Sequence, residues 1–150
     1  MITTRLACGV LAAGVLATAG ACTPSAERAR ETATSAKPPS ETVRPLLAMP
    51  LPGVKGRTFT TSIVDFPPRA RAVPHRHGDA FVYAYVLRGA VTSRLAGAPV
   101  RTYHQGENWV ERPGAHHVLT ENRSRTRPAK LLVVFVSHTG DPLKVDDAPR

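Results

Sequence analysis

The chain has 150 residues and a formal net charge of +9, from 20 Lys and Arg against 11 Asp and Glu. This length favours one domain. The basic residues are spread along the chain, and their one short group, Arg123, Arg125 and Arg127, has no aromatic residues interleaved, so no nucleic-acid partner is expected. A solvated, arginine-rich surface or attraction to anionic lipid or polymer explains the charge better.

The first predicted element is an export signal over residues 1–21. Arg5 supplies a short positive region, and an uncharged, Ala/Gly/Leu-rich run follows from Leu6 to Ala21. This layout is typical of a secretory signal, and the run is shorter and less apolar than a transmembrane helix requires. The residues Ala19-Gly20-Ala21 before Cys22 suit ordinary signal peptidase, and they also resemble the lipobox of bacterial lipoproteins.

Cleavage before Cys22 would remove Cys8 with the signal and leave Cys22 as the only cysteine of the mature chain. A lone cysteine in an exported protein has no disulfide partner within the chain, whereas lipidation would explain its position. We therefore expect an exported protein that is anchored to the cell membrane by a lipid on Cys22. The alternative is a freely secreted or periplasmic protein.

Residues 22–53 are rich in Ala, Ser, Thr and Pro and have no apolar periodicity, which predicts a flexible tether. The folded domain is expected over residues 54–142, with a C-terminal tail over residues 143–150. Short runs rich in apolar and β-branched residues, separated by Gly and Pro, predict strands over 58–66, 80–88, 91–95, 100–104, 108–111, 117–121 and 130–137.

This pattern of short strands, without an amphipathic helix outside the signal, indicates an all-β sandwich or barrel. A core of this size is marginal unless its strand edges are closed or covered by a second subunit, so we expect a homodimer.

Two segments carry the candidate metal ligands. In PHRHGDAFVYAYVLRG, from Pro74 to Gly89, His75 and His77 are two residues apart and would lie on one face of a strand. In GENWVERPGAHHVLTEN, from Gly106 to Asn122, His117 follows a Pro-Gly turn. Antiparallel pairing of the segments would gather three imidazoles into an open metal site, because neutral imidazole suits Fe, Zn, Cu and Ni.

The two segments, in this order, resemble the two motifs of the cupin superfamily. The first motif is His-x-His, four residues, Glu, six residues and Gly, and its last three fixed positions fall on His77, Val82 and Gly89. The second is Gly, five residues, Pro-x-Gly, two residues, His, three residues and Asn, and it is matched by Gly106, Gly114 and His117. The resemblance runs from about residue 62 to residue 137. It implies a single small cupin barrel of the type-2-like kind, that is, a double-stranded β-helix or jelly roll, with His75, His77 and His117 as metal ligands.

The segments depart from the cupin motifs at three positions. Val82 holds the slot of the glutamate that is usually the fourth metal ligand in cupins, and valine cannot ligate. Arg112 replaces the first proline, and Glu121 holds the Asn slot, one place before Asn122. The first departure leaves two alternatives open. The site resembles that of cupin-like thiol dioxygenases, which hold iron with three histidines, or it binds metal weakly or not at all.

Three further residues are candidates for the cavity or for contacts behind the ligands: His104, Glu111 and His116. His116 should point away from His117, because adjacent strand residues face opposite sides. His104 either points into the barrel or lies in a surface turn, and Glu111 either pairs with an arginine or acts as an acid or base in the cavity.

Alternation also predicts which side chains of the run from Phe81 to Val86 face inward. If the slot of Val82 faces the barrel, then Ala84 and Val86 line it as well, and the aromatic residues between them face the other side. Trp109 and Glu111 should share one face of their short strand, although the sequence does not say which face that is.

The resemblance implies a barrel that binds a divalent transition metal (Fe, Zn, Cu, Ni or Mn), a small molecule, or both, and the signal-like residues 1–21 add export. One alternative is a metal-dependent enzyme, similar to the three-histidine dioxygenases or to cupin isomerases, and the other is an interaction barrel without metal. No organic cofactor is indicated by the sequence. The fold hosts many activities, so it selects neither a substrate nor a reaction.

Overall fold

The computed structural model describes residues 39–148, so the predicted signal, Cys22 and the first part of the predicted tether lie outside the described residues. The described part is built from strands and contains no helix, and therefore no helix there is long and apolar enough to cross a membrane. The strands are β1 (Thr42–Pro50), β2 (Arg57–Phe66), β3 (His75–Arg76), β4 (Phe81–Arg88), β5 (Ala90–Leu95), β6 (Arg101–His104), β7 (Asn108–Glu111), β8 (His116–Glu121), β9 (Ala129–His138) and β10 (Val145–Asp146).

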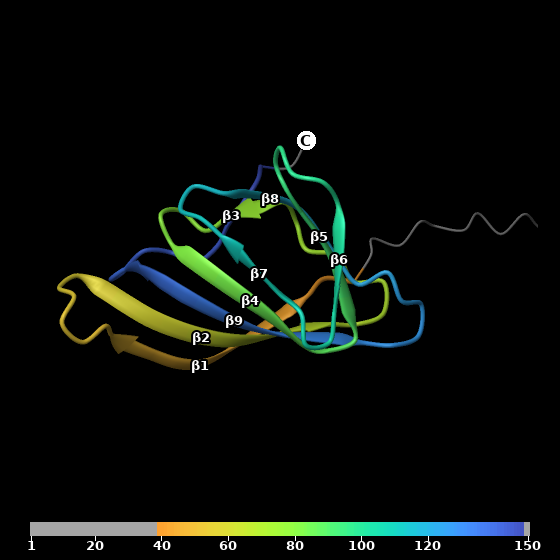
Figure 1. The fold of residues 1–150 in the computed structure, drawn as a ribbon, viewed down its shortest axis with the longest axis horizontal. Coiled ribbons are helices and arrows are strands. Elements are labelled where there is room, and N and C mark those ends of the chain that lie inside the picture. Colours follow the sequence, from red (N-terminus) through yellow and green to blue (C-terminus); the bar gives the residue numbers. More distant parts are fainter. Residues whose placement is uncertain (1–38, 149–150) are drawn as a thin grey trace, which may run out of the picture. The chain divides into compact units, whose positions relative to one another are not determined.

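The strands form two five-stranded sheets, with the orders β1-β2-β9-β4-β7 and β10-β3-β8-β5-β6 (Figure 1). Every pairing between named strands is antiparallel. The buried apolar side chains that form the core come mainly from β2, β4 and β9. The predicted all-β class is therefore confirmed, and each strand expected from the sequence is present to within one residue at either end.

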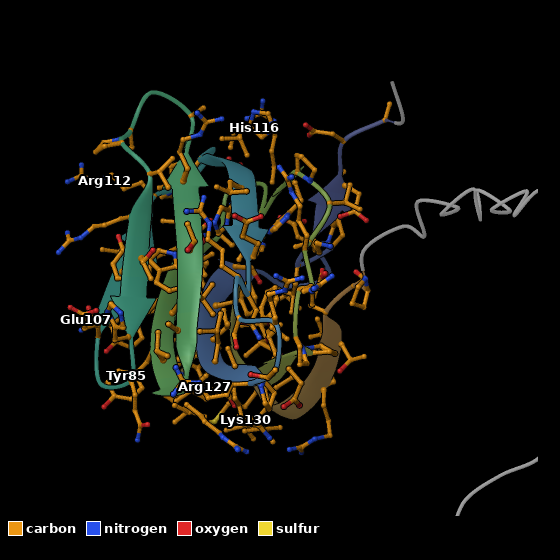
Figure 2. All side chains as sticks on the ribbon, turned by 90° about the vertical axis from the view of Figure 1, so that its right-hand side faces the viewer. Tyr85, Glu107, Arg112, His116, Arg127 and Lys130 are labelled. Carbon is orange, nitrogen blue, oxygen red and sulfur yellow. The ribbon has the colours of Figure 1, made fainter. Side chains whose placement is uncertain are left out.

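The alternation along β4 is as expected from the sequence. Val82, Ala84 and Val86 are buried in the core, whereas Phe81 is exposed. Tyr85 is half-buried and lies on the same face of β4 as Phe81 (Figure 2). The slot that the cupin pattern reserves for a ligating carboxylate thus faces inward, although it holds a valine here.

The predicted boundaries of the tether and the tail are wrong. Residues 42–50 form β1, which pairs along its length with β2, and residues 145–146 form β10, which pairs with β3. All nine residues of β1 are exposed, so backbone hydrogen bonds rather than burial hold this strand, and it carries no apolar alternation for a sequence pattern to detect. β10 has only two residues and is too short to give any pattern.

The structure explains the roles of two glycines of the motifs. Gly89 has a φ of 73°, and a Cβ at this position would lie 2.7 Å from the carbonyl oxygen of Pro128, so a larger residue is excluded. The amide N–H of Gly114 donates a hydrogen bond of 2.7 Å to the carbonyl of Gly78. This bond joins the turn before β8 to the turn after His77, which brings the two histidine segments together.

Candidate metal centre

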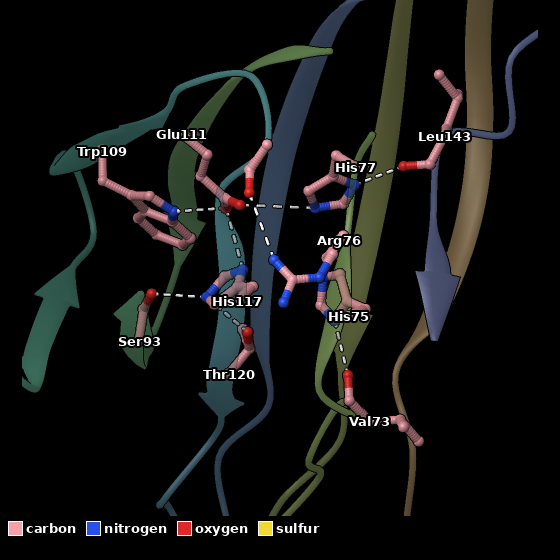
Figure 3. Close-up of polar contacts among 11 residues, drawn as sticks. Val73, His75, Arg76, His77, Ser93, Trp109, Glu111, His117, Thr120 and Leu143 are labelled. Carbon is pink, nitrogen blue, oxygen red and sulfur yellow. Dashed lines mark hydrogen bonds and ion pairs between the residues drawn. The ribbon is translucent and has the colours of Figure 1, made fainter. Parts of the chain in front are cut away.

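The structure gathers His75, His77 and His117 into one cluster (Figure 3). His75 on β3 is the direct cross-strand partner of His117 on β8, and His77 follows two residues after His75. The ring centroid of His75 lies 4.8 Å from that of His77 and 5.1 Å from that of His117. One ring nitrogen from each residue can be chosen so that all three lie within 4.8 Å of one another. The antiparallel pairing expected from the sequence therefore places three imidazoles on one wall.

Backbone carbonyls orient two of the rings. The Nδ1 atom of His75 lies 2.7 Å from the carbonyl oxygen of Val73, and Nδ1 of His77 is hydrogen-bonded to the carbonyl of Leu143. A carbonyl oxygen only accepts, so each Nδ1 carries the hydrogen and each Nε2 keeps a lone pair. Histidines that bind metals are usually held by this kind of outer hydrogen bond.

Both of these rings are neutral near pH 7. Burial lowers the pKa of His75 to about 4, because an imidazolium would lose its hydration there. Burial also lowers the pKa of His77, although the nearby Glu111 carboxylate opposes this effect. The lone pairs of both Nε2 atoms are therefore available to a metal at neutral pH.

The third ring, His117, is held by side chains. Its Nε2 atom lies 2.8 Å from the hydroxyls of both Ser93 and Thr120, while its Nδ1 atom lies 3.0 Å from Oε1 of Glu111. A carboxylate oxygen only accepts, so Nδ1 of His117 carries the hydrogen and its Nε2 accepts from the two hydroxyls. Neither Ser93 nor Thr120 belongs to a motif position, and no sequence signal pointed to them.

Glu111 is the residue whose place the sequence left most open. The structure puts its carboxylate in the cavity, 2% exposed, with Oε1 accepting a 3.0 Å hydrogen bond from the Trp109 indole. Oε2 lies 3.7 Å from Nε2 of His77 and has no hydrogen-bond partner. Burial alone would raise the pKa of Glu111. The contacts with His117, His77 and Trp109 outweigh that effect and hold the pKa below its ordinary value, so the group is ionised.

The cluster forms one wall of a cavity of about 150 Å³. Apolar side chains of β2, β4 and β9 line most of the remainder, and Val82 is among them. Lys144 and Glu41 also line this cavity, and Nζ of Lys144 lies 2.8 Å from a carboxylate oxygen of both Glu41 and Asp146. Sequence reasoning missed Glu41 and Lys144 because they lie in the segments that were predicted to be tether and tail.

The remaining candidates lie outside the cluster. His116 is half-buried (Figure 2), and its Nε2 atom lies 2.8 Å from Oδ2 of Asp147. His104 is exposed at the end of β6, beside Glu107. Arg112, which stands in the position of the first motif proline, is exposed (Figure 2).

Asn122, one place beyond the motif position, has a structural role. Its side chain is buried, its Nδ2 atom lies within 3.1 Å of the carbonyl oxygens of Phe66, Pro67 and Arg127, and its Oδ1 atom accepts from the Ser124 amide. It therefore fastens the loop after β8 to the end of β2.

Comparison with known proteins agrees with this geometry. Residues 62–135 match the family model of the cupin domain. No curated protein matches the chain. Among solved structures, oxalate oxidase in complex with the substrate analogue glycolate is similar at 25% identity and a TM-score of 0.58, over 74% of this chain and 57% of that one.

Two other solved structures show the same fold. A conserved protein with a double-stranded β-helix domain from Klebsiella pneumoniae subsp. pneumoniae has 14% identity and a TM-score of 0.57, over 73% of this chain and 86% of that one. The DMSP lyase DddQ from Ruegeria pomeroyi has 21% identity and a TM-score of 0.57, over 71% of this chain and 51% of that one. The chain thus spans little more than half of the oxidase and the lyase. The match over residues 62–135 and the shared double-stranded β-helix support the cupin superfamily for this domain.

Proposed function

We propose that the domain binds one divalent transition metal through His75, His77 and His117 and presents it to a small molecule in the cavity. The observation that carries this proposal is the approach of three imidazole nitrogens to within 4.8 Å of one another on the wall of that cavity. Two of these rings are neutral and keep a lone pair on Nε2. Such a donor set suits Fe, Zn, Cu and Ni.

The residues around the cluster fit a bound cation. A buried carboxylate oxygen of Glu111 lies near His77 with no hydrogen-bond partner, and an unsatisfied buried acceptor of this kind is costly. A bound divalent metal would supply a Lewis acid with open positions for water, oxygen or substrate. The chain itself orients His75 and His77 through the carbonyls of Val73 and Leu143, and the apolar walls restrict water around the site.

The test is the metal content of the full-length chain, purified without a histidine tag and analysed by inductively coupled plasma mass spectrometry. Full length matters because a fragment beginning at Val54 would lack β1. We expect near one equivalent of a transition metal, and loss of it in His75→Ala and in His117→Ala. His104→Ala is the matched control, because His104 is exposed and outside the cluster.

Two results would count against the proposal. Retention of full metal content in His75→Ala and His117→Ala would overturn the ligand assignment. No metal in the wild-type chain, even after reconstitution with Fe²⁺, Cu²⁺, Zn²⁺, Mn²⁺ and Ni²⁺, would overturn metal binding and favour an interaction barrel.

A second candidate function is a metal-dependent enzyme that acts on a small carboxylate, by an oxygenase-type or an isomerase-type reaction. Lys144 favours it, because this is the only Lys or Arg among the described residues that line the cavity, and an ammonium group can bind a carboxylate. The similarity to oxalate oxidase, whose structure contains glycolate, points to the same class of ligand.

Oxygen uptake by the metal-loaded chain with glycolate and other two- to four-carbon acids tests this candidate. Chromatography of the same mixtures detects an isomerised product. Lys144→Met should raise KM, whereas Lys130→Met, which removes a surface lysine paired with Asp65, should leave KM unchanged. Absence of turnover with every acid would leave a binding protein.

The proposal also includes export, lipid anchoring through Cys22 and assembly as a homodimer. Export and anchoring rest on the signal-like run before Cys22, and the dimer rests on the exposed apolar residues of β1.

A further inference from the structure

Glu111 and Val82 are cross-strand neighbours on the same face of one sheet. Val82 on β4 pairs directly with Glu111 on β7, and both side chains are buried and line the cavity that holds the histidine cluster. Side chains directly opposite on antiparallel strands have Cβ atoms about 5 Å apart. The carboxylate missing from the slot of Val82 is therefore present one strand away.

The contacts of Glu111 point its carboxylate at the cluster (Figure 3). The Trp109 indole donates to Oε1, which also lies 3.0 Å from Nδ1 of His117. Oε2 lies 3.7 Å from Nε2 of His77, which is the nitrogen whose lone pair is free. Among the described residues, the ion-pair partners of Glu111 are these two histidines and no lysine or arginine. A buried carboxylate without a cationic side chain is suited to compensate a bound cation.

We propose that Glu111 supplies the carboxylate of the metal site and takes over, from the neighbouring strand, the position that Val82 cannot fill. This inference rests on the proposed function, because it concerns the same site. Three neutral imidazoles leave the full charge of a divalent metal uncompensated, whereas Glu111 lowers it by one. Carboxylate oxygen is also a harder donor than imidazole, so Glu111 broadens the site toward Mn²⁺ and Fe²⁺.

A carboxylate swap tests the inference in the full-length chain. Isothermal titration with Mn²⁺ and with Zn²⁺ would compare the wild type, Glu111→Gln, and the double variant Val82→Glu with Glu111→Gln. We expect Glu111→Gln to weaken Mn²⁺ binding by tenfold or more, with a smaller loss for Zn²⁺, because even the loss of a group that only supports a ligand typically lowers metal affinity by about 10- to 100-fold. The double variant should recover much of the Mn²⁺ affinity. Glu107→Gln, an exposed glutamate four residues away, is the matched control and should bind as the wild type does.

Paramagnetic resonance of the Mn²⁺-loaded proteins gives a readout of the ligands that is separate from affinity. The signal of Glu111→Gln should differ from the wild-type signal, because one oxygen donor is lost. Wild-type affinity in Glu111→Gln would overturn the inference and leave a three-histidine site. A weaker affinity with an unchanged resonance signal, not recovered by the double variant, would also overturn it. Failure of the wild-type chain to bind any metal would instead overturn the proposed function.

Discussion

Val82 and Glu111 face each other across the β4–β7 pair, and both lie in the wall of the histidine-lined cavity. The sequence pattern marks Val82 as the place where a ligating side chain is missing. The sheet register shows that a carboxylate stands beside that place, on the next strand. A glutamate introduced at position 82 would therefore lie beside a carboxylate that is already present, that of Glu111.

Val82→Glu by itself should destabilise the metal-free protein. A second buried carboxylate beside ionised Glu111 meets like-charge repulsion and poor solvation, and we expect a loss of roughly 2–4 kcal/mol in the free energy of unfolding. Added Mn²⁺ should recover more stability in Val82→Glu than in the wild type. Thermal melts in EDTA and in Mn²⁺ measure both effects.

Val82→Gln is the control for size and polarity without charge. If Val82→Glu and Val82→Gln lose the same stability in EDTA, the carboxylates at positions 82 and 111 do not interact.

The metal-free protein should lose stability as the pH falls from about 6.5 toward 5. An unfolded histidine binds a proton near pH 6.5, whereas folded His75 does so only near pH 4. Between these values the unfolded chain holds more protons, so the free energy of unfolding rises with pH and falls on acidification. The full difference corresponds to roughly 3 kcal/mol between pH 6.5 and pH 4. His77, whose pKa is also lowered, acts in the same direction.

Urea unfolding in EDTA at several pH values between 5 and 7.5 measures this slope. The window stays above pH 5 because the lowered pKa of Glu111 adds its own loss of stability only below about 4.5, the ordinary value for a glutamate. His75→Asn should reduce the slope, and His104→Asn, at an exposed position, should keep it. An equal slope in His75→Asn and the wild type would show that His75 is not the titrating group.

The sequence predicted those parts of the fold in which partial burial makes apolar and polar residues alternate along the strand. β4 alternates buried and exposed residues, and the histidines stand at motif spacings, so both could be recognised without coordinates. β1 could not be recognised, because an edge strand with every residue exposed needs only backbone partners. Lys144 and Glu41 were missed because they lie just outside strands that the sequence did not reveal, in the segments that were predicted to be tail and tether.

The position of Glu111 depended on a different kind of information. Alternation placed Glu111 and Trp109 on one face of their strand, but it could not tell which face is buried. Only the pairing of β7 with β4, between residues about thirty apart in the sequence, puts Glu111 opposite Val82. Sheet register depends on pairing between strands that are distant in the sequence, so it cannot be inferred from the local pattern of residues in one strand.

Asn122→Ala should destabilise the fold without removing the metal site. The amide lies within hydrogen-bond distance of three backbone carbonyls and accepts from the Ser124 amide, and the substitution leaves these buried groups without their partner. We expect a loss of about 2–4 kcal/mol in the free energy of unfolding. Urea unfolding measures this loss, and metal content measured below the transition should stay near the wild-type value.

The neighbouring substitution Glu121→Gln is the control for Asn122→Ala. It removes only a surface ion pair with Arg123, so its effect should stay within about 0.5 kcal/mol. A loss of metal from folded Asn122→Ala would contradict the purely structural role.

Cys22→Ser should release the protein from the membrane if Cys22 carries a lipid. Cys22 lies outside the described residues, so this prediction rests on the sequence around it. Fractionation of cells into membrane and soluble parts, followed by immunoblotting, measures the distribution. Cys8→Ser is the matched control and should leave it unchanged, because Cys8 lies within the predicted signal. A Cys22→Ser protein that stays in the membrane fraction would refute lipid anchoring at this residue.

Leu47→Glu should weaken the proposed homodimer. β1 is an edge strand in which Val43, Leu46, Leu47 and Met49 are exposed in the single chain, Leu47 to 47%. An exposed apolar edge strand favours association with another chain, and a charge on it opposes that association. Light scattering coupled to size-exclusion chromatography should find a wild-type dimer and a monomeric or rapidly dissociating Leu47→Glu variant.

Val100→Glu is the matched control for the dimer, because Val100 is as exposed as Leu47. It lies just before β6, which belongs to the other sheet. It should leave the mass in solution unchanged. If Val100→Glu dissociates the protein and Leu47→Glu does not, then the second subunit covers the other sheet instead of β1. A wild-type chain that is monomeric at every soluble concentration would refute the proposed homodimer.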